Sequence, residues 1–300
     1  MGSGADGEEQ AGAVCGLEGG SGEFCNDQCA ERPGEGDASV MKLRVRELAA
    51  WGFDASPYRP ACAEERRLVP GASFDAKDCV VEVESEVVAG LFAEQALRAD
   101  LQKEMKGLDW SLGVVDLRGL IAFQRRVVIH PELERDLASD WRSLFDVAFG
   151  ASVPLMYTRR DMKDGAMVIE TANPNLQVCP ASGEAGGLFA MHGGSPFFEV
   201  GVYRGRWFLR DGYHRAYGFL RAGIVMVPAV VVRARTLVEL GPVGDWFFGE
   251  EILFGGRPPL VTDFLHDEMT IEYTRPRMLK TIRITVEESF APDPTGGDER

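Results

Sequence analysis

Residues 207–232 decide the fold, and they read WFLRDGYHRAYGFLRAGIVMVPAVVV. In the middle of this stretch apolar residues recur at helical spacing, which predicts one buried helix face made of Tyr213, Ala216, Tyr217 and Leu220. Gly223 is typical of the residue that ends such a helix. The apolar run Pro228–Val232 then predicts a short strand, with Pro228 at its start, where a missing N–H does least harm.

The segment before this helix has the alternation of a β-hairpin. Apolar residues stand at every second position on either side of Arg204-Gly205, a pair that favours a tight turn; they are Phe198, Val200, Val202, Trp207 and Leu209. Hairpin, helix and strand follow one another without a long gap. We therefore expect an α+β fold, with a mixed sheet and flanking helices.

The predicted helix start is a candidate anion site. A helix N-terminus presents N–H groups without helical partners and a partial positive charge, so it attracts anions. Gly212 lets a ligand approach the backbone closely. His214 and Arg215 lie in the first turn, off the apolar face, and Arg215 is able to hold a phosphate through two parallel hydrogen bonds. Between Arg204 and Arg221 stand five arginines and one acid, Asp211.

The same residues have a purely structural interpretation. Asp211 can cap the helix and pair with Arg215, which leaves His214 as an exposed residue without a ligand. The sequence leaves both interpretations open, and we favour the ligand-binding one because the strand–turn–helix context fits the motif.

This stretch resembles a known family. Residues 209–217 (LRDGYHRAY), then Gly223-Ile224 and residues 227–232 (VPAVVV), are similar to the core of the ParB/sulfiredoxin-like superfamily. Its members carry a Gly-x-His-Arg or Gly-x-Arg-Arg turn, a short helix, a glycine and a strand that opens near a proline. The likeness covers residues 207–232.

The resemblance implies a nucleotide site. The family's turn binds nucleotide phosphates, ATP in sulfiredoxin and in free-serine kinases and CTP in ParB. On this basis Gly212, His214 and Arg215 take the phosphate, with Asp211 beside them. A weaker upstream likeness brings Gln124 to the nucleotide, although a plain surface loop explains Gln124 equally well.

The departures from the family also matter. Sulfiredoxin has a cysteine before the histidine, and Tyr213 stands there, which argues against its redox chemistry. ParB-type DNA binders continue into a helix-turn-helix domain, and after Val232 no basic recognition helix follows. The distance from Gln124 to Gly212 implies an insertion at about 150–196.

Composition limits the class of protein. The net charge is −15, and residues 1–40 contain nine acids, one base and ten glycines. This tail, 1–40, is expected to be disordered, and the C-terminal residues 291–300 flexible. An acidic protein lacks the broad basic surface of a general nucleic-acid binder. The sequence shows neither an export signal nor an apolar run of the ~18 residues that a membrane helix needs, so we expect a cytoplasmic protein.

The remaining elements are read from local patterns. Residues 41–108 form a partly helical lead-in to a domain at 109–290. Val81 and Val83 indicate a short strand, and Ser85 is expected to cap a helix that runs to about Met105, with Leu97, Leu101 and Met105 as its apolar stripe. A second helix is predicted from Pro131 to Phe149. Asp164-Gly165 indicates a hairpin between residues 155–157 and 167–169.

Cysteine and histidine residues give no metal site. The six cysteines include Cys25 and Cys29, but no second pair follows at metal-site spacing, and free thiols in a reducing compartment are expected.

Three functions remain open. The first is an ATP- or CTP-binding protein that extends to phosphoryl transfer onto a small molecule, with Mg²⁺ held by carboxylates. The second is a nucleotide-sensing or protein-interaction module without turnover, and the third and weakest is a DNA-associated regulator. No catalytic base is identified, because Glu170 and Asp263 are candidates by residue type only and Glu199 is expected to point away from the Val200 face of a regular strand.

Overall fold

The computed structural model describes residues 42–52, 66–68, 74–129, 137–151, 154–173, 176–180, 189–241 and 247–286. These residues form a mixed α+β structure with several sheets and five α-helices. The predicted α+β class is confirmed. The tail at 1–40 and the C-terminal 291–300 lie outside the described residues.

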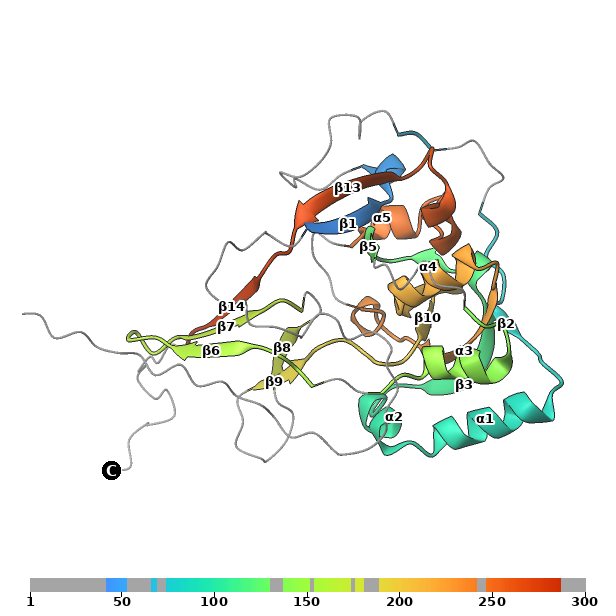
Figure 1. Cartoon of the computed structure of the whole chain (residues 1–300), viewed down its shortest axis with the longest axis horizontal. Coiled ribbons are helices and arrows are strands. Elements are labelled where there is room, and N and C mark those ends of the chain that lie inside the picture. Colours follow the sequence, from blue (N-terminus) through green and yellow to red (C-terminus); the bar gives the residue numbers. More distant parts are fainter. Residues whose placement is uncertain are drawn as a thin grey trace, which may run out of the picture. The chain divides into compact units, whose positions relative to one another are not determined.

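A six-stranded mixed sheet forms the centre of the larger part of the chain (Figure 1). Its strands run in the order β2 (Val80–Val81), β3 (Trp110–Asp116), β12 (Met226–Arg233), β10 (Glu199–Tyr203), β11 (Arg206–Asp211) and β4 (Ile121–Ala122). β10 is parallel to β12 and β11 is parallel to β4, while the other neighbours are antiparallel. β11 and β12 therefore lie on opposite sides of β10, although the chain reaches β12 directly after β11 and one helix.

The predicted hairpin is confirmed as β10 and β11. Its two turn residues both have positive φ, 50° at Arg204 and 72° at Gly205. Two successive left-handed residues make a turn whose twist matches that of the flanking strands.

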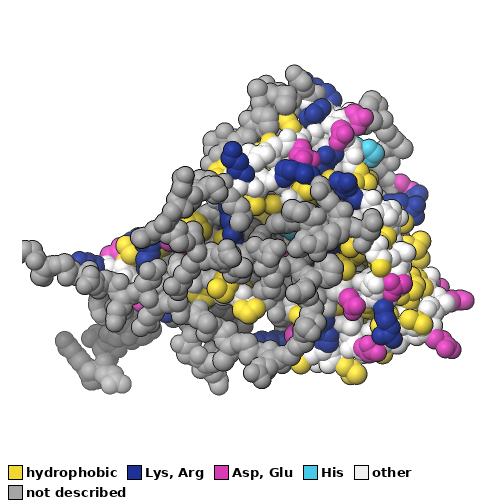
Figure 2. Space-filling model, in the orientation of Figure 1, with side chains coloured by type: hydrophobic (Ala, Val, Ile, Leu, Met, Phe, Trp, Pro, Cys, Tyr) yellow, Lys and Arg dark blue, Asp and Glu magenta, His cyan; other side chains and the backbone are white. Residues whose placement is uncertain are grey.

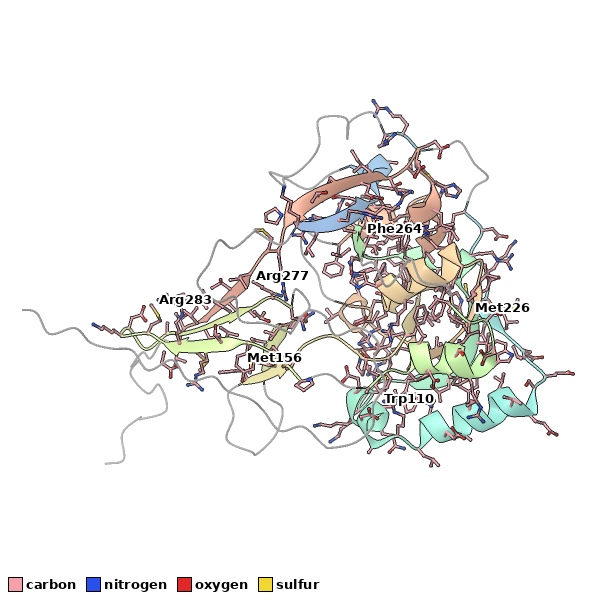
Figure 3. The ribbon with its side chains drawn as sticks, in the orientation of Figure 1. Trp110, Met156, Met226, Phe264, Arg277 and Arg283 are labelled. Carbon is pink, nitrogen blue, oxygen red and sulfur yellow. The ribbon has the colours of Figure 1, made fainter. Side chains whose placement is uncertain are left out.

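Helix α4 (Tyr213–Arg221) begins directly after the hairpin, as the apolar spacing predicts. The four residues of the expected apolar face are all buried, and they are Tyr213, Ala216, Tyr217 and Leu220. Gly223 has φ +74° and follows the helix end. α4 packs against β5 (Arg126–Ile129) and the 3₁₀ helix η6 (Val261–Leu265), where Figure 3 labels the buried Phe264.

β12 corrects the predicted strand start. The strand begins at Met226, so Pro228 lies inside it rather than at its first position. Pro228 is opposite Val114 of β3, whereas pairing with β10 begins only at Val230. The proline thus has a strand neighbour on one side only, which is how a strand in mid-sheet tolerates a residue without N–H.

The predicted helix from Ser85 to Met105 is two helices. Ser85 caps α1 (Glu86–Ala96) as expected, with its side chain accepting from the Val88 N–H. Arg98 is extended, and α2 (Ala99–Glu104) starts after it. Leu97, expected on the buried stripe, is 81% exposed, because the helix has already ended there.

The helix predicted from Pro131 is shorter at its start. α3 (Trp141–Ala148) has Asp140 as its N-cap, and the Asp140 side chain accepts from the Ser143 N–H. Residues 137–139 are not helical, and 131–136 lie outside the described residues. The capping carboxylate, rather than the proline, sets the helix start.

A second sheet joins distant parts of the chain, β13 (Ile271–Pro276), β1 (Lys42–Glu47) and β5, all antiparallel. Its small apolar cluster contains Val45, Ala49, Ile271 and Tyr273. The remaining short helices are η1 (Ala49–Trp51), η3 (Leu117–Gly119), η5 (Leu237–Glu239) and α5 (Glu250–Leu253).

The described residues within 154–193 and 278–286 belong to a separate compact unit. It contains the antiparallel sheet β14 (Lys280–Ile284), β7 (Met167–Thr171) and β6 (Thr158–Asp161), and the pair β8 (Gln177–Pro180) and β9 (Phe189–His192). The hairpin expected at Asp164-Gly165 joins β6 to β7, with φ +79° at Gly165. Its first strand begins at Thr158, later than predicted. Arg283 of β14 pairs with Asp164 at the turn.

No helix among the described residues is long and apolar enough to cross a membrane. On the face drawn in Figure 2, acidic and basic side chains are interspersed over the described atoms.

Replacing Tyr213 by Phe tests the attachment of α4. The buried Tyr213 hydroxyl accepts from the N–H groups of Phe123 (2.6 Å) and Gln124 (2.9 Å) and donates to the Leu209 carbonyl (2.7 Å). Tyr213→Phe leaves these groups without that partner and should lower the free energy of unfolding by about 3 kcal/mol in urea denaturation.

Tyr217→Phe is the matched control, because Tyr217 is buried on the same helix and its hydroxyl makes no hydrogen bond with the described residues. Equal stability losses in the two variants would contradict the role given to the Tyr213 hydroxyl.

Candidate functional site

The turn before α4 has the geometry of an open helix start. Gly212 is the N-cap residue, with φ +97° and ψ 25°, and no side chain caps the helix. A Cβ atom built on Gly212 would lie 2.6 Å from Cδ2 of Phe198. Both the left-handed backbone and the close aromatic ring therefore require glycine here, whether or not a ligand binds.

Asp211 organises the turn. Its carboxylate accepts from the Gly212 N–H at 2.5 Å and from the Ser195 N–H at 3.0 Å. The Arg215 guanidinium lies 3.9 Å away. Burial raises the pKa of Asp211, and the positive charge of Arg215 opposes that shift. Asp211 thus ties the segment before β10 to the end of β11.

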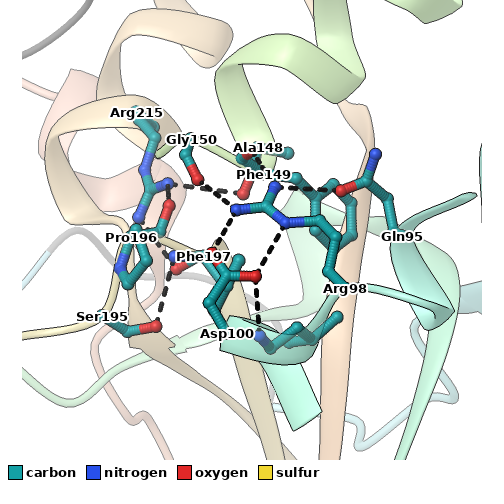
Figure 4. Close-up of polar contacts among 11 residues, drawn as sticks. Gln95, Arg98, Asp100, Ala148, Phe149, Gly150, Ser195, Pro196, Phe197 and Arg215 are labelled. Carbon is teal, nitrogen blue, oxygen red and sulfur yellow. Dashed lines mark hydrogen bonds and ion pairs between the residues drawn. The ribbon is translucent and has the colours of Figure 1, made fainter. Parts of the chain in front are cut away.

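Arg215 is engaged with main-chain carbonyl groups. Its Nη1 donates to Pro196 at 2.6 Å and to Ala148 at 3.4 Å, and its Nη2 donates to Phe197 at 2.8 Å (Figure 4). Nη1 also lies 3.4 Å from the Val147 carbonyl. The side chain is 14% exposed. The two-pronged grip expected for a phosphate is thus directed at the chain itself.

A second arginine completes the end of α3. Arg98 donates to the carbonyls of Phe149 (2.6 Å) and Gly150 (2.9 Å), and it pairs with Asp100 at 2.7 Å. The last carbonyls of a helix have no intrahelical partner and attract cations. Figure 4 shows both guanidinium groups directed at this helix end, so Arg98 and Arg215 together cap α3.

The other expected site residues lie around the same turn. His214 is half-buried in the first turn of α4. The backbone of Gln124 is held beside that turn by the Tyr213 hydroxyl, but its side-chain amide donates to the Arg126 carbonyl. Gln124 therefore meets the end of the buried Tyr213 side chain and not the open side of the turn, and its amide is directed along its own loop.

Glu199 is a buried acid next to this turn. A register irregularity between Glu199 and Val200 makes Asp211 the cross-strand partner of Glu199. Glu199 is buried, with 1% exposure, whereas the Asp211 side chain is 31% exposed. One carboxylate oxygen pairs with Arg210, and the other, Oε1, has no hydrogen-bond partner.

The environment of Glu199 changes its protonation. Burial raises its pKa from 4.5 to about 7, against the positive charge of Arg210, and the negative charge of Asp211 adds to the rise. Counting back from the Arg204-Gly205 turn puts Glu199 opposite Arg210, so the sequence contained a signal for a buried acid–base pair here. The irregularity that brings Asp211 opposite has no such signal.

The two other acids considered for catalysis have structural partners. Asp263 binds the Arg257 guanidinium at 2.9 Å and accepts from the Leu260 N–H at 2.7 Å. Glu170, in the separate unit, pairs with Arg160 at 2.6 Å. Among the described residues no group of three or more His, Cys, Asp or Glu side chains forms a metal-binding cluster.

Comparison with protein-family models, with curated proteins and with solved structures finds no match.

Arg215→Ala should destabilise the protein. The variant removes the donors that hold Pro196, Phe197 and the end of α3, and we expect the free energy of unfolding to fall by about 3 kcal/mol. Arg221→Ala, an exposed position at the other end of α4, should change it by less than about 0.5 kcal/mol. Chemical denaturation of both variants measures the difference, and similar values would show that the Arg215 contacts contribute nothing specific.

Glu199 should make stability depend on pH. Because its folded pKa is raised, its favourable contribution is complete below the ordinary value of 4.5 and is lost as the pH rises to about 7. Between these limits the free energy of unfolding of wild type should therefore fall by roughly 3 kcal/mol relative to that of Glu199→Gln. Urea denaturation at pH 5 and at pH 8 compares the two proteins, and a stability difference that is the same at both values would refute this assignment.

Proposed function

We propose that the protein binds the phosphate groups of a nucleotide, ATP or CTP, at the start of α4. The observation that carries the proposal is the helix start itself, which follows a left-handed glycine and has no side-chain cap. Side chains cap α1 and α3, whereas α2 and α5 also begin without a side-chain cap, so it is the left-handed glycine together with the first-turn histidine that sets the start of α4 apart. Amides at an uncapped helix start are suited to a phosphate.

In this site the backbone and His214 contact the phosphate. The first-turn amides of Tyr213, His214 and Arg215 point toward the N-terminal end of the helix. The His214 imidazole adds a donor, and a positive charge when protonated. The Arg215 guanidinium holds the 195–197 segment in place, so Arg215 acts as a positioning residue that shapes the site without touching the ligand.

The arrangement of the core supports the likeness to the ParB/sulfiredoxin-like superfamily. Hairpin, left-handed glycine, short helix and returning strand follow in the order that the likeness implies. The parallel pairing of β12 with β10 places the crossover helix α4 between the hairpin and its parallel neighbour. The family's known ligands are the reason for choosing ATP and CTP among nucleotides.

Phosphoryl transfer onto a small molecule is an extension of this proposal. It requires Mg²⁺ and an acid–base group near the phosphates. Asp211 and Glu199 are the carboxylates next to the turn, and both are held by arginines, Asp211 by Arg215 and Glu199 by Arg210. A nucleotide that brings its own Mg²⁺ fits this arrangement better than a metal held by the protein alone.

His214→Glu separates binding from folding. A carboxylate in the first turn favours the helix but repels a phosphate, so the variant should lose at least about tenfold in affinity, and its urea denaturation midpoint shows separately what the change costs the fold. Arg221→Gln, which changes the net charge by the same amount at the far end of α4, should bind as wild type does. Calorimetric titration with ATP and with CTP, with Mg²⁺ and with EDTA, measures both.

Failure of wild type to bind either nucleotide, or equal affinities of the two variants, would overturn the proposal. A hydrolysis assay on any nucleotide that binds then distinguishes a phosphoryl-transfer enzyme from a sensing module without turnover.

A further inference from the structure

Glu199 is the acid next to the proposed phosphate site whose charge the structure satisfies least well. It is 1% exposed, its Oε1 atom has no hydrogen-bond partner, and its cross-strand neighbour Asp211 is the residue directly before the helix N-cap. A buried carboxylate with an unpartnered oxygen is costly when charged and much less so when protonated.

The groups around Glu199 come from four parts of the chain. Arg210 and Asp211 approach it from β11, one as a cation and the other as an acid. The Ser195 side chain, in the segment before β10, lies beside the Glu199 carboxylate and favours its charged form without reaching hydrogen-bond geometry at Oε1, and Glu104 of α2 adds a further negative charge. On β12 its neighbour is the apolar Val230. Around the Glu199 carboxylate there are therefore one cation, Arg210, and two further acids, Asp211 and Glu104.

We propose, on the basis of the phosphate site described above, that Glu199 takes up a proton from solvent at Oε1 when a nucleotide binds at the start of α4. The phosphate brings negative charge next to Asp211 and Glu199, which are already close to one another. Protonation of Glu199 removes one of the repelling charges, and the Ser195 hydroxyl can accept a hydrogen bond from the new O–H. Binding and protonation then favour each other, as linkage requires.

The raised pKa of Glu199, about 7, supports this coupling, since a small further rise on binding falls in the neutral range. The direction follows from the signs of the charges. Added negative charge raises the pKa of the carboxyl group, so the bound state holds more protons than the free state, and affinity should increase as the pH falls.

Titration of wild type with ATP and Mg²⁺ in buffers of different ionisation enthalpy tests the coupling. The phosphates of ATP are themselves ionised between pH 7.5 and 8.5, and for a rise of one unit in the pKa of Glu199 binding should take up about half a proton at pH 7.5 and about a fifth of a proton at pH 8.5. For a bound-state rise of one pH unit, the dissociation constant should be roughly tenfold lower on the acid side of the transition than on the alkaline side.

Glu199→Gln should lose the part of the proton uptake and of the pH dependence that belongs to Glu199 and keep only the part that protonation of His214 contributes. Glu94→Gln, which removes an exposed acid on α1, should keep the proton uptake of wild type. Because the wild-type measurement is sufficient alone, the test does not depend on the folding of Glu199→Gln.

The outcomes are distinct. ATP binding without proton uptake in wild type, or with undiminished uptake in Glu199→Gln, would overturn the coupling and leave the phosphate site standing. Absence of ATP and CTP binding by wild type would overturn both.

Discussion

The guanidinium of Arg215 is the contact on which the geometry of the turn depends. It joins three segments that are distant in sequence: the first turn of α4, the end of α3 and the Pro196-Phe197 entry to β10. The α3 end has carbonyls that no helical N–H can reach, and the entry to β10 has carbonyls that precede the ladder. A planar fork of donors satisfies both sets at once, which a lysine ammonium cannot do in the same geometry. The contact thereby fixes the segment that leads into β10, while the strand itself is held by its pairing with β11 and β12.

The sequence predicted the elements whose signals are local. The hairpin depends on alternation and on two turn residues with positive φ, and α4 depends on apolar spacing and on Gly212. Each of these is decided within about ten residues. The errors occur where a distant contact decides. The break between α1 and α2 places Arg98 so that it reaches Phe149 and Gly150, and nothing near Arg98 in sequence indicates that partner.

The site was predictable to the same extent. A helix start after a glycine is a local feature, and the sequence located it. Whether Arg215 faces a ligand or the chain depends on where Pro196 and Phe197 lie, and that depends on tertiary structure. The pairing of Glu199 with Asp211 could not be predicted from the sequence for a related reason. A regular hairpin pairs it with Arg210 alone, and only the irregularity before Val200 brings Asp211 opposite to it.

These contacts change what kind of phosphate site the turn can be. Many phosphate sites rely on an arginine whose fork binds the ligand. Here Arg215 binds carbonyls and Arg210 binds Glu199, so two cations of this basic stretch are already committed. The attraction that remains comes from the helix amides and His214, and it acts against two nearby acids. In a site of this kind, removing one negative charge should increase the affinity for phosphate more than adding a further arginine would. In the proposed site, protonation of Glu199 therefore reduces the local negative charge, as an arginine that binds the phosphate does in other sites. The affinity depends on pH because the positive and negative charges around the turn nearly cancel.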